Sequence, residues 1–129
     1  MLMSATCVAL VDDEAPVRVA LGRLLRLGGH EVSAFASGEE FLESLPARLP
    51  ECVLLDVHMP GMTGLQVQAR LRAMGLALPV IFITASDDAE IARRALEAGG
   101  LLVLHKPFSN ELLLDAVNLA LKQRPQPGT

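Results

Sequence analysis

The sequence predicts a single α/β domain, in which a five-stranded parallel sheet is covered by helices on both faces. Short apolar runs alternate five times with helical patterns along the 129 residues. Several of the runs are apolar throughout, as expected for strands that are buried on both faces. In such sheets the crossovers are right-handed, and ligands bind beyond the carboxyl ends of the strands.

The five expected strands are short segments rich in Val, Leu and Ile. The fourth is strongly β-branched, which favours an extended backbone. The two cysteines fit neither a zinc pattern nor a disulfide framework, so we interpret them as reduced thiols in the core. The strands are expected at Cys7–Val11, about Glu31–Phe35, about Cys52–Asp56, Val80–Thr84 and Leu101–His105.

The segments between the strands carry start and stop signals for five helices. Pro16 suits a first helical turn, and Gly28 with Gly29 ends that helix. Ser37 with Glu40 three residues later has the form of a capping box. The helices are expected at about Ala15–Leu27, between Ser37 and Pro46, at about Leu65–Met74, at about Asp88–Ala98, and from Ser109 or Asn110 to about Lys122.

Composition excludes several classes of function. The net charge is −4 and the basic residues are scattered, so no nucleic-acid-binding surface is expected. No apolar run approaches the roughly 20 residues that a membrane-spanning helix needs. The first residues lack the charged start of a secretion signal. We therefore expect a cytoplasmic protein that binds neither nucleic acid directly nor membranes.

Three of the expected strands end in reactive side chains, which are Asp12-Asp13, Asp56 and Lys106. If the strands are parallel neighbours, these ends meet at one edge of the sheet. Three clustered carboxylates repel one another unless a cation lies among them. The loop after the first strand carries acids and not the glycines of a phosphate-binding loop. Oxygen ligands of this kind suit Mg²⁺.

Asp56 is the candidate nucleophile of this site. A carboxylate can attack phosphorus and form an aspartyl-phosphate. The ammonium of Lys106 can hold a phosphoryl oxygen as a point charge, and the hydroxyl of Thr84 can donate to another. These groups come from several strand ends, and their combination is more specific than any one of them.

The combined motifs resemble the receiver domain of bacterial two-component response regulators. The resemblance covers about residues 5–122 and leaves 123–129 as a disordered tail or linker stump. It implies a flavodoxin-like fold with strand order 2-1-3-4-5. The motifs that carry it are Asp12-Asp13, Asp56, Met59-Pro60-Gly61, Thr84-Ala85 and Lys106-Pro107-Phe108.

The resemblance also implies a metal and its ligands. Asp56 takes a phosphoryl group from a phosphohistidine on a sensor histidine kinase or a phosphotransfer protein. Asp13 and Asp56 bind Mg²⁺, Asp12 binds it through water, and the backbone carbonyl of His58 completes the protein ligands. Mn²⁺ can substitute for Mg²⁺ in such a site.

The groups implied to contact the phosphoryl group are Lys106, Thr84 and the backbone amide of Ala85. The Lys106–Pro107 peptide bond is expected to be cis, an isomer that is rare outside positions where it serves a purpose. The chain then promotes its own phosphorylation and dephosphorylation but turns over no separate substrate, so it is not an enzyme in the usual sense.

Two rival interpretations remain open. A pseudo-receiver, a module that only binds proteins, is suggested by Val103, which stands where many receivers carry an aromatic switch residue. A phosphatase of the haloacid-dehalogenase type also uses an Asp at a strand end. That family needs a second Asp two residues later, where this chain has His58, and no cap insertion is visible.

The last helix is unusually apolar for a helix with one buried side. Leu114 and Leu121, seven residues apart, are expected outside the core, and an exposed apolar stripe usually marks a partner surface. We predict dimerisation or output-domain docking through the helix at 88–98, the strand at 101–105 and the last helix. An output domain, as in transcription regulators, can follow Thr129 in a longer parent chain.

Overall fold

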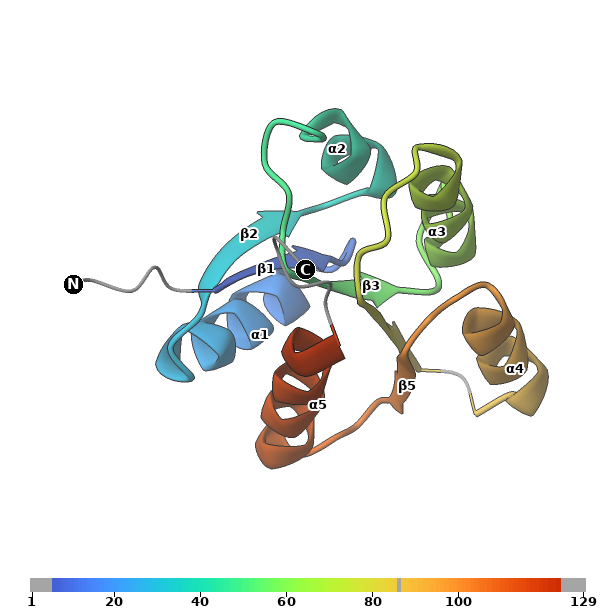
Figure 1. The fold of residues 1–129 in the computed structure, drawn as a ribbon. Helices are drawn as coiled ribbons and strands as arrows, with labels where there is room; N and C mark the ends of the chain where they lie inside the picture. The colour runs from blue at the N-terminus through green and yellow to red at the C-terminus, as the bar shows by residue number, and fades with distance from the viewer. Residues whose placement is uncertain (1–5, 86, 124–129) are drawn as a thin grey trace.

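A five-stranded parallel sheet forms the centre of the molecule (Figure 1). The structure, a computed structural model, describes residues 6–85 and 87–123. The strand order is β2-β1-β3-β4-β5, and each neighbouring pair is parallel, which confirms the predicted topology. The strands are β1 (Cys7–Val11), β2 (Glu31–Phe35), β3 (Cys52–Asp56), β4 (Val80–Thr84) and β5 (Leu102–His105).

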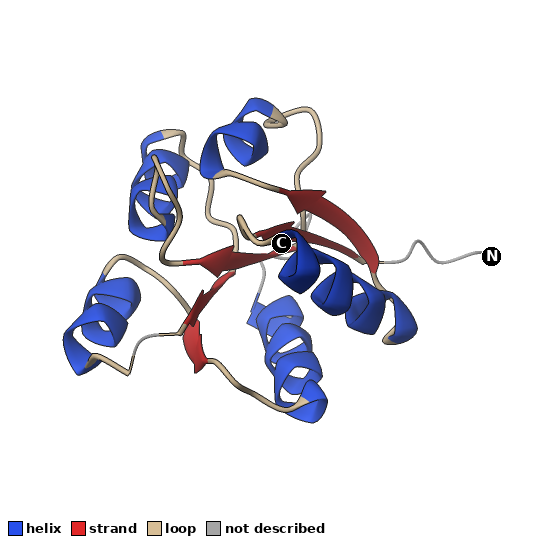
Figure 2. Ribbon diagram, turned by 180° about the vertical axis from the view of Figure 1, so that it is seen from behind, coloured by secondary structure: helices blue, strands red, loops and turns tan. Residues whose placement is uncertain are grey.

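In the described part of the chain, four helices connect the strands and a fifth follows β5, and together they cover both faces of the sheet (Figures 1 and 2). The expected helices are all present, and most of their ends lie within a residue of the prediction. Gln123, which we expected in the tail, is the last residue of a helix, and residues 124–129 lie outside the described residues. The helices are α1 (Ala15–Leu27), α2 (Gly38–Glu43), α3 (Gly64–Ala73), α4 (Ala89–Glu97) and α5 (Asn110–Gln123).

Each face of the sheet has its own hydrophobic cluster. On one face, α2, α3 and α4 contribute Phe41, Val67 and Ala95 to the cluster. On the other face, α1 and α5 contribute Leu25 and Val117. Because alternate residues of a strand point to opposite faces, a strand between two helical layers is apolar at every position. All five residues of β4 are accordingly buried.

The prediction that Leu114 and Leu121 lie on the outer side of α5 is wrong. Leu114 and Leu121 are partly buried and pack against the cluster shared by α1 and α5. Gly28, just after α1, leaves room for Leu114, because a Cβ added there would lie 2.9 Å from the Leu114 Cδ2. The leucines of α5 that face solvent are Leu112, 48% exposed, and Leu119, 43% exposed. They also lie seven residues apart, so an exposed pair exists on a different side of the helix.

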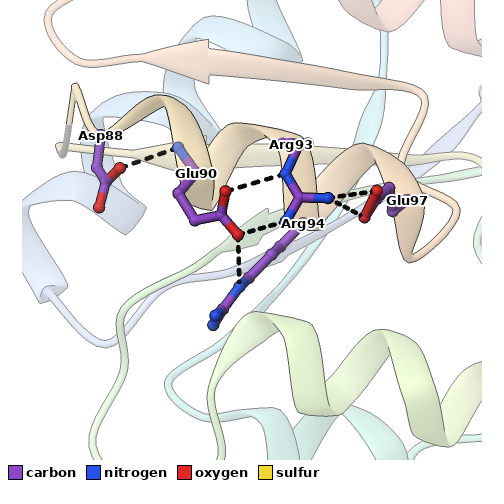
Figure 3. Close-up of polar contacts among 5 residues, drawn as sticks. All are labelled: Asp88, Glu90, Arg93, Arg94 and Glu97. Carbon is purple, nitrogen blue, oxygen red and sulfur yellow. Dashed lines mark hydrogen bonds and ion pairs between the residues drawn. The ribbon is translucent and has the colours of Figure 1, made fainter.

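The solvent-facing side of α4 is a chain of charged contacts within the helix (Figure 3). The carboxylate of Asp88 caps the helix by accepting a hydrogen bond from the amide of Glu90, at 2.9 Å. The guanidinium of Arg93 lies between Glu90 and Glu97, and Arg94 pairs with Glu90 as well. All of these side chains are about half exposed or more.

Among the described residues, the helices lack the length and apolar character that a membrane-spanning segment needs.

Candidate functional site at the carboxyl edge of the sheet

The predicted reactive residues meet at the carboxyl edge of the sheet. Asp56 and Thr84 are the last residues of β3 and β4, and Asp12 and Lys106 directly follow β1 and β5. Parallel register aligns these ends, since Asp56 pairs with Ile83 and Thr84 pairs with His105. The backbone amide of Lys106 extends the ladder by donating to the carbonyl of Thr84, at 2.8 Å.

Three carboxylates form a compact cluster at this edge. Asp12, Asp13 and Asp56 each offer an oxygen, and these oxygens all lie within 4.8 Å of one another. Asp12 is 1% exposed and Asp56 is 5% exposed, whereas Asp13 faces solvent. The cluster is thus buried on one side and open on the other. Its hard oxygen donors and its spacing suit a divalent cation such as Mg²⁺.

Burial and the neighbouring acids alter the acidity of Asp56. The pKa of its carboxyl group is raised to about 6, first because burial disfavours the charged form and then because Asp12 is close. Asp13 raises this pKa further, while Lys106 and the amide of His58 lower it. That amide lies 3.3 Å from the Asp56 Oδ1. Without a cation, a large part of the Asp56 population carries a proton near pH 6.

The ammonium of Lys106 lies on the α1 side of the cluster. Its Nζ is 3.4 Å from the Asp12 Oδ2 and 3.9 Å from the Glu14 Oε1. The peptide bond from Lys106 to Pro107 is cis, as the resemblance implied. The lysine therefore stands beside the acids and close enough to Asp56 to influence its charge.

The other expected contacts of a bound phosphoryl group differ in their exposure. Thr84 is fully buried, while Ala85, the next residue, is exposed. His58 is exposed as well, two residues beyond Asp56. The structure places these three residues at or just after the carboxyl ends of β3 and β4, and the roles expected of the Thr84 hydroxyl, the Ala85 amide and the His58 carbonyl stay predictions.

Three further residues shape the site and were not singled out from the sequence. A terminal nitrogen of Arg18 donates to the backbone carbonyl of Asp12, at 2.7 Å. Glu14 contacts Lys106. Gly64, the first residue of α3, lies so close to the backbone of Asp56 that a Cβ would be 2.3 Å from its carbonyl oxygen. The local signal that could have found it is a glycine directly after the N-cap Thr63, because glycine permits a close backbone approach.

The fold and this arrangement of acids and lysine define a class of signalling domain. The family model for the response regulator receiver domain matches residues 8–118, and the chain belongs to that family. Members of this family act in two-component systems and have a regulatory role.

Individual relatives support the assignment. The transcriptional regulatory protein TdiR of Thauera aromatica is 42% identical over 118 residues, which are 92% of this chain and 52% of TdiR. The transcriptional regulatory protein FixJ of Bradyrhizobium diazoefficiens is 32% identical over 116 residues, which are 90% of this chain and 57% of FixJ. The chain spans about half the length of the curated relatives that it matches.

Solved structures show the same architecture. The crystal structure of FixJ-N has a TM-score of 0.89 and 31% identity, and the alignment covers 96% of this chain and 99% of that one. A response regulator receiver protein from Burkholderia phymatum has a TM-score of 0.82 and 46% identity, with coverage of 94% and 99%. The flavodoxin-like fold predicted from the sequence is therefore confirmed.

Proposed function

We propose that this domain is a switch controlled by phosphorylation, in which Asp56 accepts a phosphoryl group from a phosphohistidine. The donor is a sensor histidine kinase or a phosphotransfer protein. The observation that carries this proposal is the acid cluster, with Asp12 and Asp56 buried, and Lys106 at the same edge of the sheet. Such a set is costly to bury and is expected where the acids have a chemical task.

The proposed reaction is an in-line phosphoryl transfer. A carboxylate oxygen of Asp56 attacks phosphorus, the bond from phosphorus to the donor breaks, and the donor leaves with the electron pair of that bond. The product is an acyl phosphate on Asp56. Lys106, the hydroxyl of Thr84 and the amide of Ala85 bind the oxygens of the transferred group.

We propose the metal ligands that the family resemblance implies, and the clustering of the three acids supports them. Asp13, Asp56 and the His58 carbonyl would hold Mg²⁺ directly, and Asp12 would hold it through water. When bound, Mg²⁺ supplies positive charge that keeps Asp56 ionised and offsets the charge of the incoming phosphoryl group. Asp12, almost fully buried, fixes the inner side of the site, and the amide of Glu14 donates to its Oδ1 at 2.9 Å.

We propose that output runs through the surface formed by α4, β5 and α5. Val103 on β5 is partly buried and packs against the cluster under α2, α3 and α4, so no aromatic ring is available there to swing outward. A conformational signal would travel instead through the backbone after Thr84 and through α4. Leu112 and Leu119 supply the exposed apolar part of this surface for a second copy or an output domain.

Intact mass measures the proposed reaction directly. The protein is incubated with Mg²⁺ and phosphoramidate, and we expect a gain of about 80 Da, the mass added by one phosphoryl group. Removing divalent cations with a chelator, or changing Asp13 to Asn, should slow the gain strongly. Asp56→Asn should abolish it.

The rival functions predict other results. A pseudo-receiver shows no mass gain with any donor. A phosphatase of the haloacid-dehalogenase type releases phosphate continuously from many phosphate monoesters. Asp115→Asn on α5, which changes an acid of the same type outside the site, is the matched control and should gain mass like the wild type.

A further inference from the structure

The contact between Glu14 and Lys106 sets this site apart from a simple acid cluster. Glu14 is the N-cap residue of α1, but within the described part of the chain its side chain makes no capping hydrogen bond. Its Oε1 instead lies 3.9 Å from the Lys106 ammonium. A short polar side chain is the usual choice at this position, because it can satisfy a free amide of the first turn. Here the side chain of the cap residue points to the lysine.

Lys106 is therefore shared between two carboxylates before any phosphoryl group arrives. Asp12 is buried and its Oδ1 is fixed by the amide of Glu14, so its position is rigid. Glu14 is 62% exposed, and its contact with the lysine can be broken with little cost. A phosphoryl group on Asp56 would need the same ammonium. Binding that group and holding Glu14 are thus competing arrangements of one cation.

We propose that Glu14 is a positioning residue that retains the Lys106 ammonium on the α1 side of the site and thereby slows phosphorylation of Asp56. This inference rests on the proposed function of Asp56 as phosphoacceptor. In the phosphorylated protein the ammonium leaves Glu14 and contacts a phosphoryl oxygen. Loss of the Glu14 contact removes one competitor for the lysine and should speed the reaction.

Two substitutions separate this contact from a general effect of charge. Glu14→Gln removes both the charge and the ion pair. Glu14→Asp keeps the charge, but its side chain is one methylene shorter and withdraws from a lysine already at 3.9 Å. If only repulsion of the anionic donor matters, the Asp variant should behave like the wild type.

Glu39 provides the matched control on another element. It is an exposed acid in the first turn of α2, with its Oε2 beside Gly61 in the loop that follows β3. Glu39→Gln removes one negative charge without touching the lysine. At about 0.15 M salt, charges farther apart than about 8 Å are largely screened, so this variant reports the residual effect of net charge.

The first measurement is the initial rate of mass gain with Mg²⁺ and subsaturating phosphoramidate. We expect Glu14→Gln and Glu14→Asp to react about two- to fivefold faster than the wild type, the range expected for losing a partly exposed ion pair. Glu39→Gln should stay close to the wild type. Equal rates for the wild type and Glu14→Gln, or a wild-type rate for Glu14→Asp, would overturn the proposal.

The second measurement observes the lysine in the unphosphorylated protein. The chain has only two lysines, Lys106 and Lys122, so their Nζ resonances are readily resolved by ¹⁵N NMR. Both Glu14 variants should shift the Lys106 resonance and leave that of Lys122 in place, whereas Glu39→Gln should move neither. An unchanged Lys106 resonance in both Glu14 variants would contradict the contact.

The two proposals fail in different ways. A wild type that gains no mass overturns the phosphoacceptor function and this inference with it. A wild type that gains mass at the same rate as both Glu14 variants overturns the role of Glu14 alone.

Discussion

The acid cluster at the edge of the sheet and the ion pairs on α4 differ in how their charges are arranged and solvated. At the carboxyl edge of the sheet, three like-charged acids crowd together and two of them are buried. On α4, acids pair with arginines within one helix and face solvent. Asp56 has a pKa raised to about 6, whereas the pKa of the exposed Glu90 is lowered by its hydrogen bond to Arg93.

The difference shows where the fold holds unfavourable electrostatic energy. Like charges held in a buried site destabilise the cation-free protein, and binding of a cation or a modification relieves that energy. The charges on α4 are already neutralised by neighbours and are well hydrated, so they add little to stability. We therefore expect substitutions at the sheet edge to have large effects and substitutions on α4 to have small ones.

The largest expected loss of stability comes from a substitution at Gly64, which lies against the backbone of Asp56. Gly64→Ala places a Cβ 2.3 Å from the carbonyl oxygen of Asp56, so β3 and α3 must separate. We expect a loss of about 3 kcal/mol in the free energy of unfolding, measured by urea denaturation. Gly75→Ala is the control, since its φ is +74 but no atom lies within 4 Å of the added Cβ. It should lose about 1 kcal/mol, and an equal loss in both variants would refute the close approach.

The next largest effect is a gain in the free energy of unfolding. Asp56→Asn removes a carboxyl group whose pKa is about 6 in the folded protein and 3.8 as its ordinary value. Because the folded state holds this proton more tightly, the wild type loses stability as pH rises from about 4 through 6. Without divalent cations, the variant should be more stable than the wild type by about 2 kcal/mol at pH 8 and nearly equal at pH 4.

Thermal unfolding at both pH values measures this difference. Adding Mg²⁺ at pH 8 should raise the melting temperature of the wild type much more than that of Asp56→Asn. A variant that is less stable than the wild type at pH 8 in chelator would show that the acid cluster is not strained.

A smaller difference in stability is expected between substitutions on the two sides of α5. Leu114→Ala should cost about 1–2 kcal/mol, because this partly buried side chain packs against the α1–α5 cluster. Leu119→Ala should change stability by less than about 0.5 kcal/mol, since Leu119 is 43% exposed. Paired urea titrations check both values. Equal losses would mean that the exposed side of α5 has been placed wrongly.

The smallest loss of stability is expected for a substitution on α4. Arg93→Ala removes ion pairs with Glu90 and Glu97, all of them about half exposed. We expect a loss below about 1 kcal/mol at low salt, which shrinks further in 1 M NaCl because the pairs are screened. A loss comparable to that of Gly64→Ala would abolish the contrast between the two regions.

Much of this molecule could be predicted because its signals are local. Continuous apolar strands such as Val80–Thr84 indicate burial on both faces, and Ser37 marked the start of α2 by its capping chemistry. The main site acids were found because parallel strands bring their carboxyl ends to one edge. The rotation of α5 was missed, because the side that α1 covers is decided by packing between helices, here Leu114 against Gly28.

The roles of Glu14 and Gly64 were missed for the same reason. From the sequence, Glu14 is one more acid in an acidic loop, and only the tertiary structure shows its contact with Lys106, 92 positions away in the chain. Gly64 follows a capping residue, Thr63, and its closeness to the Asp56 carbonyl depends on how α3 packs beside β3. Contacts between distant segments leave no periodic pattern in the sequence.

Asp56 is the residue that we propose to react with the phosphoryl donor. Treatment of the phosphorylated protein with borohydride reduces an aspartyl-phosphate to homoserine, which tandem mass spectrometry locates in the chain. We predict homoserine at position 56, formed only after incubation with phosphoramidate and Mg²⁺. Homoserine at position 12 or 13, or its absence from a protein that has gained about 80 Da, would contradict the account.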